Sequence, residues 1–292
     1  MRAEGSSPRA RIMAKLVENR GAMIGAGIMC CLLLMSVFAY LVMPYDPFET
    51  NPRSALQPPT SQHWMGTDNL GRDVLSRLIL GSRWSLRVGL IAVGVSALIG
   101  VPLGLVAGYS GKTVDAWISR GVEVLMAIPA ILLALGIVAI LGPGAGNIMI
   151  AVGVTGVPRY ARVVRASVLS ARENTYVEAA RAAGSPGIQI MARHILPNVL
   201  SPVIVISTIQ IAGAILSASS LGFLGLGAQP PIPEWGEMLS SARSFMRTAW
   251  WLTLFPGIAI MLSVLSMNLL GDGLRDALDP RLLQAGSHYS ER

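Results

Sequence analysis

The sequence predicts an all-α membrane protein with six transmembrane helices and both termini in the cytoplasm. Hydrophobic residues make up 52% of the 292 residues and charged residues only 13%, whereas a soluble domain carries about a quarter charged residues. Six apolar runs follow one another along the chain, and a helix needs about 20 such residues to cross a bilayer. Lys and Arg gather on one side of that arrangement. The predicted spans are residues 22–43, 89–109, 121–141, 147–158, 199–227 and 250–271.

The first run has an alternative interpretation as a secretory signal peptide. A basic segment precedes it, and Val37-Phe38-Ala39 resembles a cleavage site. The apolar part is longer than the roughly 7–15 residues of a signal peptide, and five further runs follow. We therefore predict an uncleaved anchor. A cytoplasmic tail, 1–21, precedes it, and residues 22–66 hold this span and the start of an outer loop.

The fourth run, 147–158, is short for a span. Arg159, Arg162 and Arg165 follow it directly. The prediction therefore requires the basic end to continue as a helix out of the membrane.

The distribution of Lys and Arg sets the orientation, because cytoplasmic loops carry an excess of positive charge. With the N-terminus in the cytoplasm, 16 of the 23 cations fall on the cytoplasmic side and seven on the outer side. The net charge of +7 thus fits loops at the surface of a lipid bilayer. A nucleic-acid partner is not expected, because it would need a basic stripe on a soluble fold.

Two outer segments are long enough to be structured. In the first, apolar residues at helical spacing predict a short amphipathic helix over 71–81 at the outer interface. Asp68 or Asn69 is expected to cap it, and Asp73 and Arg77 are expected to pair at i, i+4. In the second, residues 228–249, three prolines predict a stiff turn, and tryptophans are typical of an interfacial belt. These tryptophans are Trp235, Trp250 and Trp251.

Within the second predicted span, Gly100, Gly104 and Gly108 repeat every four residues. Such a face without side chains favours close packing of a neighbouring helix, and a substrate-facing groove is the alternative. Prolines inside the predicted spans are expected to bend helices. They are Pro102, Pro129, Pro202 and Pro256.

The chain carries no pattern typical of a catalytic, nucleotide-binding or metal site. Five of the six runs contain no ionisable residue, and Glu123 lies near the cytoplasmic end of the third, which argues against a proton-coupled carrier. Gly111-Lys112-Thr113 mimics a phosphate-binding loop, but the required upstream glycine is replaced by Val106. We predict a moving pore with no energy source, cofactor or metal of its own, while a sodium-coupled carrier or a channel stays open.

One polar stretch, 175–202, lies between two predicted spans on the cytoplasmic side. Ala, Glu and Arg favour a helix from Thr175 to Ala183, and Gly184 is suited to the position just after its end. Ser185 and Pro186 can start a second helix, which Pro197 is expected to end. The stretch is thus predicted to be a helix–turn–helix knob suited to docking in a groove. An ordinary solvated loop is the alternative.

These residues carry a resemblance to a known family. Glu178-Ala179-Ala180, then Gly184, then Ile195-Leu196-Pro197 resembles the EAA motif of ABC importer permeases, although His194 stands where the family often has an apolar residue. Residues 63–86, 220–239 and 268–281 are similar to the second permease subunit of dipeptide, oligopeptide, glutathione and nickel importers. In that peptide branch a histidine at this place is usual.

The resemblance implies a type I ABC importer permease fold, with its core over 84–272, the EAA loop at 172–197 and a cytoplasmic tail at 273–292. It implies a non-catalytic subunit of the bacterial inner membrane. The expected partners are a homologous second permease, two ATPase subunits that bind ATP and Mg, and a periplasmic substrate-binding protein. Short peptides are the expected substrate, and nickel, glutathione or another small solute are the alternative substrates. An ion-coupled secondary carrier is the alternative class of transporter.

The resemblance also implies site residues at both ends of the chain's spans. The residues expected to couple to the ATPases are Glu178, Ala179, Ala180, Arg181, Gly184, Ile195, Leu196 and Pro197. Those expected on the side of the binding protein are Asp68, Gly71, Arg72, Asp73, Arg77 and Trp235.

Overall fold

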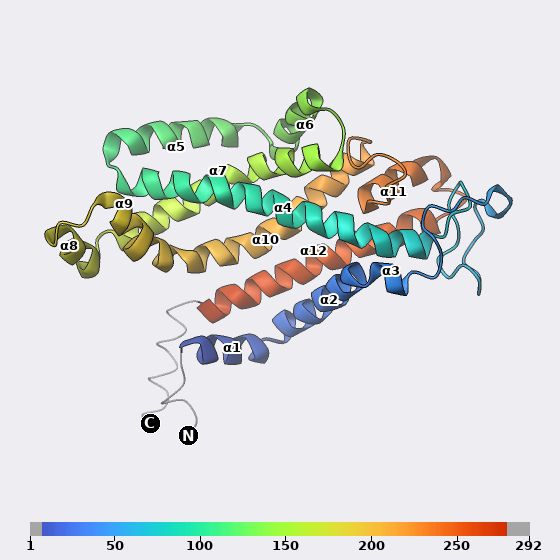
Figure 1. Cartoon of the computed structure of the whole chain (residues 1–292), viewed down its shortest axis with the longest axis horizontal. Helices are drawn as coiled ribbons and strands as arrows, with labels where there is room; N and C mark the ends of the chain where they lie inside the picture. The colour runs from blue at the N-terminus through green and yellow to red at the C-terminus, as the bar shows by residue number, and fades with distance from the viewer. Residues whose placement is uncertain (1–7, 279–292) are drawn as a thin grey trace, which may run out of the picture.

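The computed structural model describes residues 8–278, and its regular structure there is helical apart from one strand-like bridge between Thr67 and Asp73. Long helices run along one axis, and the two ends of the bundle differ (Figure 1). The elements are α1 (Pro8–Glu18), α2 (Arg20–Val37), α3 (Ala39–Val42), η1 (Pro52–Ser54), α4 (Val74–Tyr109), α5 (Lys112–Ala127), α6 (Ala130–Leu141), α7 (Ala145–Ala171), α8 (Thr175–Ala182), α9 (Gly187–Ile190), the π-helical turn η2 (Met191–Ile195), α10 (Leu196–Phe223), α11 (Trp235–Ala242), η3 (Arg243–Phe245) and α12 (Trp251–Leu278).

Four helices in the described residues are long and apolar enough to cross a membrane. They are α2, α4, α12 and the continuous helix Gly187–Phe223 that contains α10. The pair α5 and α6 adds a fifth, broken span, bent by 91°. Helix α7 is 27 residues long but carries Arg159, Arg162 and Arg165 in its second half. The basic end of the fourth run does continue as helix, as predicted, and the count of six spans stays a prediction.

The 91° bend lies where Ile128 and Pro129 separate α5 from α6. Pro129 lacks a backbone N–H and disfavours helical dihedrals in the residue before it. Ile128 accordingly has extended backbone, with φ −92° and ψ 127°. The predicted effect of this proline is confirmed.

The glycine face of α4 is a packing face, as predicted. Helix α4 makes its most extensive contact with α7. A Cβ on Gly100 would lie 2.7 Å from the carbonyl oxygen of Val157, and one on Gly104 would lie 2.6 Å from that of Ala161. Gly108 faces Val168 in the same way. The absence of side chains therefore lets the two backbones approach closely.

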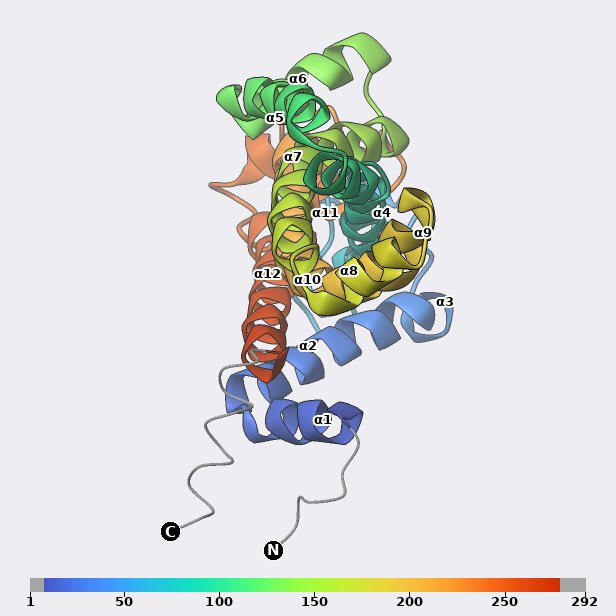
Figure 2. The ribbon, with the colours of Figure 1, turned by 90° about the vertical axis from the view of Figure 1, so that its left-hand side faces the viewer.

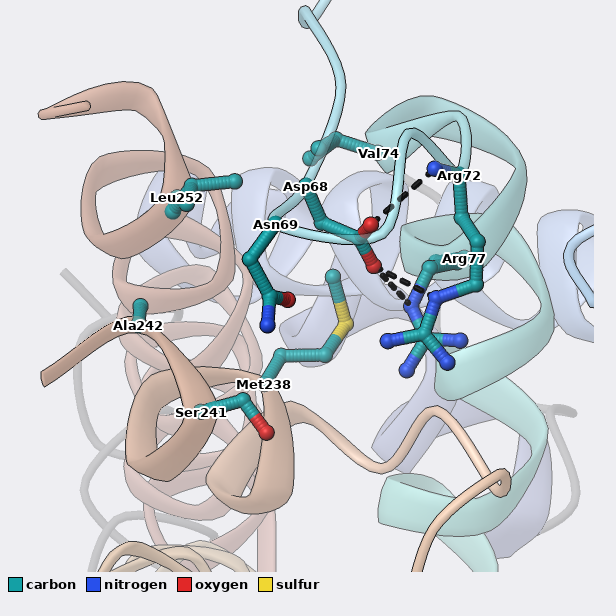
Figure 3. Close-up of a pocket in the computed structure, with 9 residues that line it drawn as sticks. All are labelled: Asp68, Asn69, Arg72, Val74, Arg77, Met238, Ser241, Ala242 and Leu252. Atoms are coloured by element: carbon teal, nitrogen blue, oxygen red, sulfur yellow. Dashed lines mark hydrogen bonds and ion pairs between the residues drawn. The ribbon is translucent and has the colours of Figure 1, made fainter. Parts of the chain in front are cut away.

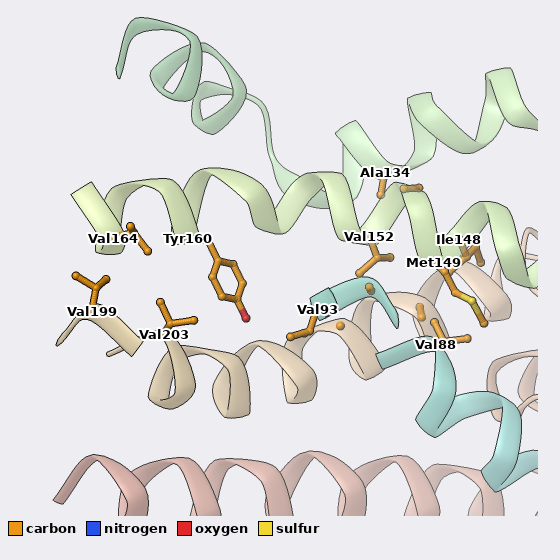
Figure 4. Close-up of a cluster of buried hydrophobic side chains, with 14 of the residues drawn as sticks. Val88, Val93, Ala134, Ile148, Met149, Val152, Tyr160, Val164, Val199 and Val203 are labelled. Atoms are coloured by element: carbon orange, nitrogen blue, oxygen red, sulfur yellow. The ribbon is translucent and has the colours of Figure 1, made fainter. Parts of the chain in front are cut away.

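The main apolar core lies between α4, α6, α7 and α10 (Figure 4). Tyr160 on α7 is fully buried in it, and its hydroxyl lies 2.7 Å from the Ser207 hydroxyl of α10. A second cluster surrounds Trp235 and Trp251 near the other end of the bundle. The core therefore fixes the relative positions of α4, α7 and α10, the helices on which the sites below depend.

Two element predictions near the outer loop are wrong. The helix predicted for 71–81 is not separate, because it forms the first turns of the 36-residue helix α4. Gly81 lets the helix continue past the 228–234 segment, since a Cβ there would meet the carbonyl oxygen of Pro233. The cap is Asp73, whose carboxylate accepts a hydrogen bond from the Ser76 amide at 2.8 Å. Neither Asp68 nor Asn69 caps this helix.

The prediction that Pro197 ends the second helix of the knob is wrong. The chain runs as one helix from Gly187 to Phe223, with Pro197 in the first turn of α10. Proline has no backbone N–H to donate, and a local π-helical adjustment lets a helix continue past such a residue. The π-helical turn Met191–Ile195 comes directly before it.

The described ends of the chain are also helical. Helix α1 lies within the predicted tail 1–21, and α12 runs into the predicted tail 273–292 as far as Leu278. Figure 2 shows α1 at the edge of the bundle beside α2 and the end of α12, with which it makes contact. The predictions for 1–7 and 279–292, including Arg2, Arg281 and Arg292, lie outside the described residues.

Candidate functional site

The predicted knob forms a compact unit at the same end of the bundle as α1 and the end of α12 (Figure 1). Helix α8 spans Thr175–Ala182 and ends at Gly184, whose φ is +77°. The Gly184 amide donates to the Arg181 carbonyl at 2.9 Å, and the Ser185 amide donates to the Ala180 carbonyl at 3.1 Å. Glycine adopts this left-handed conformation without a steric penalty. The predicted position of Gly184 is confirmed.

Three apolar side chains anchor the knob to the bundle. Val177, Ile190 and Ile195 are each at most 1% exposed, and they belong to the main core with Val168 of α7 and Val199 of α10. Of the predicted coupling residues, Ile195 is therefore an anchor within the chain. It does not lie at the surface.

The other predicted coupling residues form the outer surface of the knob. Glu178, Ala179, Arg181, Gly184 and Pro197 are exposed, and Ala180 and Leu196 are half-buried. Ile188, which the sequence analysis did not single out, is 78% exposed in the same unit. A charged and alanine-rich surface with one protruding apolar side chain is suited to contact with another protein.

The end of α4 braces the knob, and the sequence alone did not indicate this contact. The Arg181 guanidinium lies over the Tyr109 ring, 5.3 Å from its centroid. The Arg172 side chain donates to the Gly108 carbonyl at 3.2 Å. Gly187 leaves room for the ring, because a Cβ there would lie 3.0 Å from Tyr109 Cε1. The knob is thus held by α4 as well as by α7 and α10.

The basic half of α7 is tied to α5 by a second contact that the sequence analysis missed. Arg165 binds the Asp115 carboxylate through two nitrogens, and Nη2 lies 2.6 Å from Oδ2. The two residues are 50 positions apart, so spacing along one helix carries no signal for them. This pair holds the start of α5 against α7.

The six residues predicted at the outer end are all buried. Asp68, Arg72, Asp73 and Arg77 are 8% exposed or less, Trp235 is fully buried, and Gly71 is buried as well. The placement of Trp235 in an interfacial belt is therefore wrong, and so is that of Trp251, which is 5% exposed; Trp250 is 53% exposed. Trp235 donates from its ring nitrogen to the Leu78 carbonyl at 3.1 Å.

Asp68, Arg72 and Arg77 form one ionic cluster (Figure 3), which Arg77 extends to Glu237 and to the loop at Pro47. Arg72 Nε lies 2.6 Å from Asp68 Oδ2, and Arg77 Nε lies 3.6 Å from the same oxygen. Arg77 also reaches Glu237 Oε2 of α11 at 3.4 Å and donates to the Pro47 carbonyl at 3.2 Å. Buried charges are stable only when they are paired and hydrogen-bonded. The cluster therefore fixes the outer loop to α4 and α11.

The predicted pair between Asp73 and Arg77 is wrong. Asp73 accepts from Ser76 at the start of α4 and lies 2.9 Å from His63 Nδ1. Its carboxylate is engaged by the helix start, so Arg77 pairs with Asp68 and Glu237 instead. The cavity beside the cluster has a volume of about 20 Å³, which is room for one water molecule and too little for a ligand.

A buried glutamate fixes the start of α11. The Glu234 carboxylate accepts from the amides of Gly236 and Glu237 at 2.9 and 3.1 Å, and from the Ser85 hydroxyl at 3.3 Å. Burial raises the pKa of Glu234 above its usual value, opposed by these hydrogen bonds. No sequence pattern described above predicts this role for Glu234.

Within the described residues, no group of three or more His, Cys, Asp or Glu side chains is placed to hold a metal ion. The candidate functional surfaces are the exposed knob at one end and the loop surface held by the ionic cluster at the other (Figure 1). Neither arrangement holds a nucleophile and a base positioned for catalysis.

Comparison with known proteins decides the family. Residues 100–284 match the family model described as "Binding-protein-dependent transport system inner membrane component". The chain belongs to this family. Residues 7–59 also match the model of the N-terminal TM domain of oligopeptide transport permease C. The permease is accordingly a non-catalytic, multi-pass membrane subunit of a bacterial ABC transporter, which works with ATPase subunits, a substrate-binding protein and a paired permease.

Curated relatives cover nearly the whole permease. It is 48% identical to the dipeptide transport system permease protein DppC of Alkalihalophilus pseudofirmus, over 94% of this chain and 91% of the relative. It is 46% identical to the di/tripeptide transport system permease protein DppC of Pseudomonas aeruginosa, over 96% and 94%. Identity to the glutathione transport system permease protein GsiD of Pectobacterium atrosepticum is 47%, over 89% and 87%.

A solved structure confirms the fold class. A chain of the MetNI methionine ABC transporter in inward-facing conformations superposes with a TM-score of 0.58 at 20% identity. The match covers 70% of this permease and 97% of that chain. The helical bundle is thus the type I ABC importer permease fold.

Proposed function

We propose that this permease forms half of the pathway through which short peptides enter a bacterial cell across its inner membrane. One observation carries the proposal: the chain is nearly half identical, over more than nine-tenths of its length, to permeases named for dipeptide and di/tripeptide transport. A match of that length covers the helices that would line the pathway as well as the docking surfaces.

The complete importer, in this proposal, is a heterodimer of this chain and a homologous permease. Two ATPase subunits bind ATP and Mg on the cytoplasmic side, and a periplasmic binding protein delivers the peptide. The knob and the described chain ends lie at one end of the bundle, and the loop before α4 and α11 lies at the other. That arrangement agrees with the orientation expected from the distribution of Lys and Arg.

The knob transmits the ATPase motion. Closure of the ATPase dimer displaces the surface formed by Glu178, Ala179, Arg181 and Gly184. The buried anchors Val177 and Ile195 pass the displacement to α7 and α10, so the helices rock as rigid bodies between inward-facing and outward-facing states. The tight packing of these anchors supports this role, because a loosely attached loop would absorb the movement.

At the outer end, the ionic cluster of Asp68, Arg72 and Arg77 acts indirectly on the binding protein. Its residues are buried, so they shape the loop whose exposed side chains make the contact. Trp64, 72% exposed, and Leu70, 43% exposed, lie on that loop. We assign the direct contact with the binding protein to this exposed surface.

Glutathione is a second candidate substrate, favoured by the 47% identity to GsiD. Family membership speaks against an ion-coupled carrier.

The test is uptake into vesicles that contain the permease pair, its ATPases and its binding protein. We expect ATP-dependent import of radiolabelled dipeptides or tripeptides. Import of glutathione or nickel alone would refute the peptide assignment, and uptake driven by an ion gradient without ATP would refute the ABC mechanism.

A further inference from the structure

A pocket that contains a few polar side chains lies halfway along the bundle, away from both ends. Side chains from α4, α5, α6, α7 and α10 line it, and its volume is about 370 Å³. That size is within the range of small-molecule sites. Most of the lining is apolar, and the polar members are Ser96, Thr155, Arg159, Gln210 and Ser217.

Arg159 lies near the middle of helix α7. It is 14 residues from the first residue of α7 and 12 from the last. At 1.5 Å per residue it lies about 18 Å from the end of the helix at Ala171. Its side chain is exposed in the single chain and lines the pocket. The sequence alone predicts that Arg159 lies just beyond the fourth span.

The charge of Arg159 has no acidic partner within the described residues. No ion pair joins it to any carboxylate in residues 8–278, in contrast to Arg165, which binds Asp115. A guanidinium stays charged in proteins, and the neutral amide of Gln210 that it contacts does not balance that charge. The pocket thus offers a positive charge without a balancing negative one.

Gln210 of α10 accepts a hydrogen bond from Arg159 Nη1 at 2.7 Å. Gly156, one turn before Arg159, leaves space for it, since a Cβ there would lie 3.1 Å from Gln210 Nε2. This single hydrogen bond uses one of the five N–H groups of the guanidinium. The other N–H groups and the Gln210 amide remain available to a ligand.

We propose that Arg159 and Gln210 bind the α-carboxylate of a peptide during its passage through the permease. The inference rests on the proposed function, because it concerns the path of that same substrate. Arginine binds a carboxylate through two parallel hydrogen bonds, and Thr155 and Ser217 offer hydroxyls to the peptide's amide groups. One guanidinium in a wide pocket holds the peptide weakly enough to release it, as a transport path requires.

The test measures peptide imported and ATP hydrolysed in the same vesicles, with the complete importer assembled. In Arg159→Gln, the ratio of peptide to ATP falls about tenfold, as expected for the loss of a charge-assisted hydrogen bond. Arg159→Lys restores part of the ratio. Gln210→Glu places a carboxylate against the guanidinium and lowers the ratio without removing Arg159. Arg162→Gln, which removes a charge one turn along outside this pocket, keeps the wild-type ratio.

The ratio separates this role from a structural one, because poor assembly lowers import and ATP hydrolysis together. A wild-type ratio in both Arg159→Gln and Gln210→Glu overturns the inference. An equal fall in Arg162→Gln also overturns it, since the effect would then belong to the general positive charge of α7. Failure of the wild-type importer to move any peptide refutes the proposed function instead, so the two failures are distinguishable.

Discussion

Gly184 allows a test of the knob in which only the backbone changes. Its φ of +77° requires the left-handed conformation, and a Cβ at this position would meet no atom within 4 Å. Replacement by alanine therefore costs only the energy of holding an L-residue in the left-handed backbone conformation, about 1 kcal/mol. Asparagine tolerates this conformation well. Proline, with φ fixed near −65°, cannot adopt it and also removes the amide that donates to Arg181 at 2.9 Å.

The series Gly184→Asn, Gly184→Ala and Gly184→Pro should be graded in its effect. A cost of 1 kcal/mol changes the population of the native knob by about fivefold. We expect the Asn variant to keep most of the ATP hydrolysis that the substrate-loaded binding protein stimulates. The Ala variant should lose part of it, and the Pro variant should lose it entirely while still inserting into the membrane.

The assay is ATP hydrolysis by the reconstituted importer with and without loaded binding protein, alongside the amount of permease in the membrane. Normal stimulation in Gly184→Pro would refute the coupling role of the knob. Equal loss in Gly184→Asn and Gly184→Pro would refute the conformational argument, because it would mean that the docking surface tolerates no side chain at this point.

The remaining predictions concern packing, charge and the outer end. Gly104→Ala should lower the unfolding temperature of the purified permease, since overpacking costs about 1–3 kcal/mol. The control is Gly94→Ala in the same helix, where a Cβ meets nothing within 4 Å, and it should leave the unfolding temperature unchanged. Equal unfolding temperatures for the two variants would contradict the packing of α4 on α7. Glu178→Lys should change the free energy of unfolding by less than about 0.5 kcal/mol, because the site is exposed. The same variant should abolish stimulated ATP hydrolysis. Normal stimulation would count against docking of the ATPase at Glu178. Trp235→Ala should cost about 3–5 kcal/mol and reduce the folded protein recovered in detergent; unchanged recovery would show that this fully buried ring is dispensable.

Local signals explain what the sequence predicted well. The end of α8 at Gly184, the bend at Pro129 and the packing face from Gly100 to Gly108 each depend on residues next to one another on one helix or turn. The knob between α7 and α10 could be predicted from the sequence because it, too, depends on residues close to one another in the chain. Each of these features requires only propensity, periodicity and the geometry of glycine and proline.

Contacts between distant segments explain what the sequence could not predict. Arg77 pairs with Glu237, 160 residues away, so the pairing with Asp73 suggested by spacing was wrong. Trp235 fits an interfacial belt by composition, but the packing of α11 against α4 and α12 buries it. Arg159 follows the apolar run that predicted the fourth span, and only the full length of α7 shows that it lies in the middle of that helix.

The length of α4 has a consequence for signalling across the membrane. Its 36 residues span about 54 Å at 1.5 Å per residue. One end carries Arg77, which is locked to Glu237, and the other end carries Tyr109, which lies under Arg181. Such a helix is held at both ends and can transmit a movement along its length. We therefore expect that docking of the binding protein on the outer side tilts the ATPase contact on the inner side directly through α4.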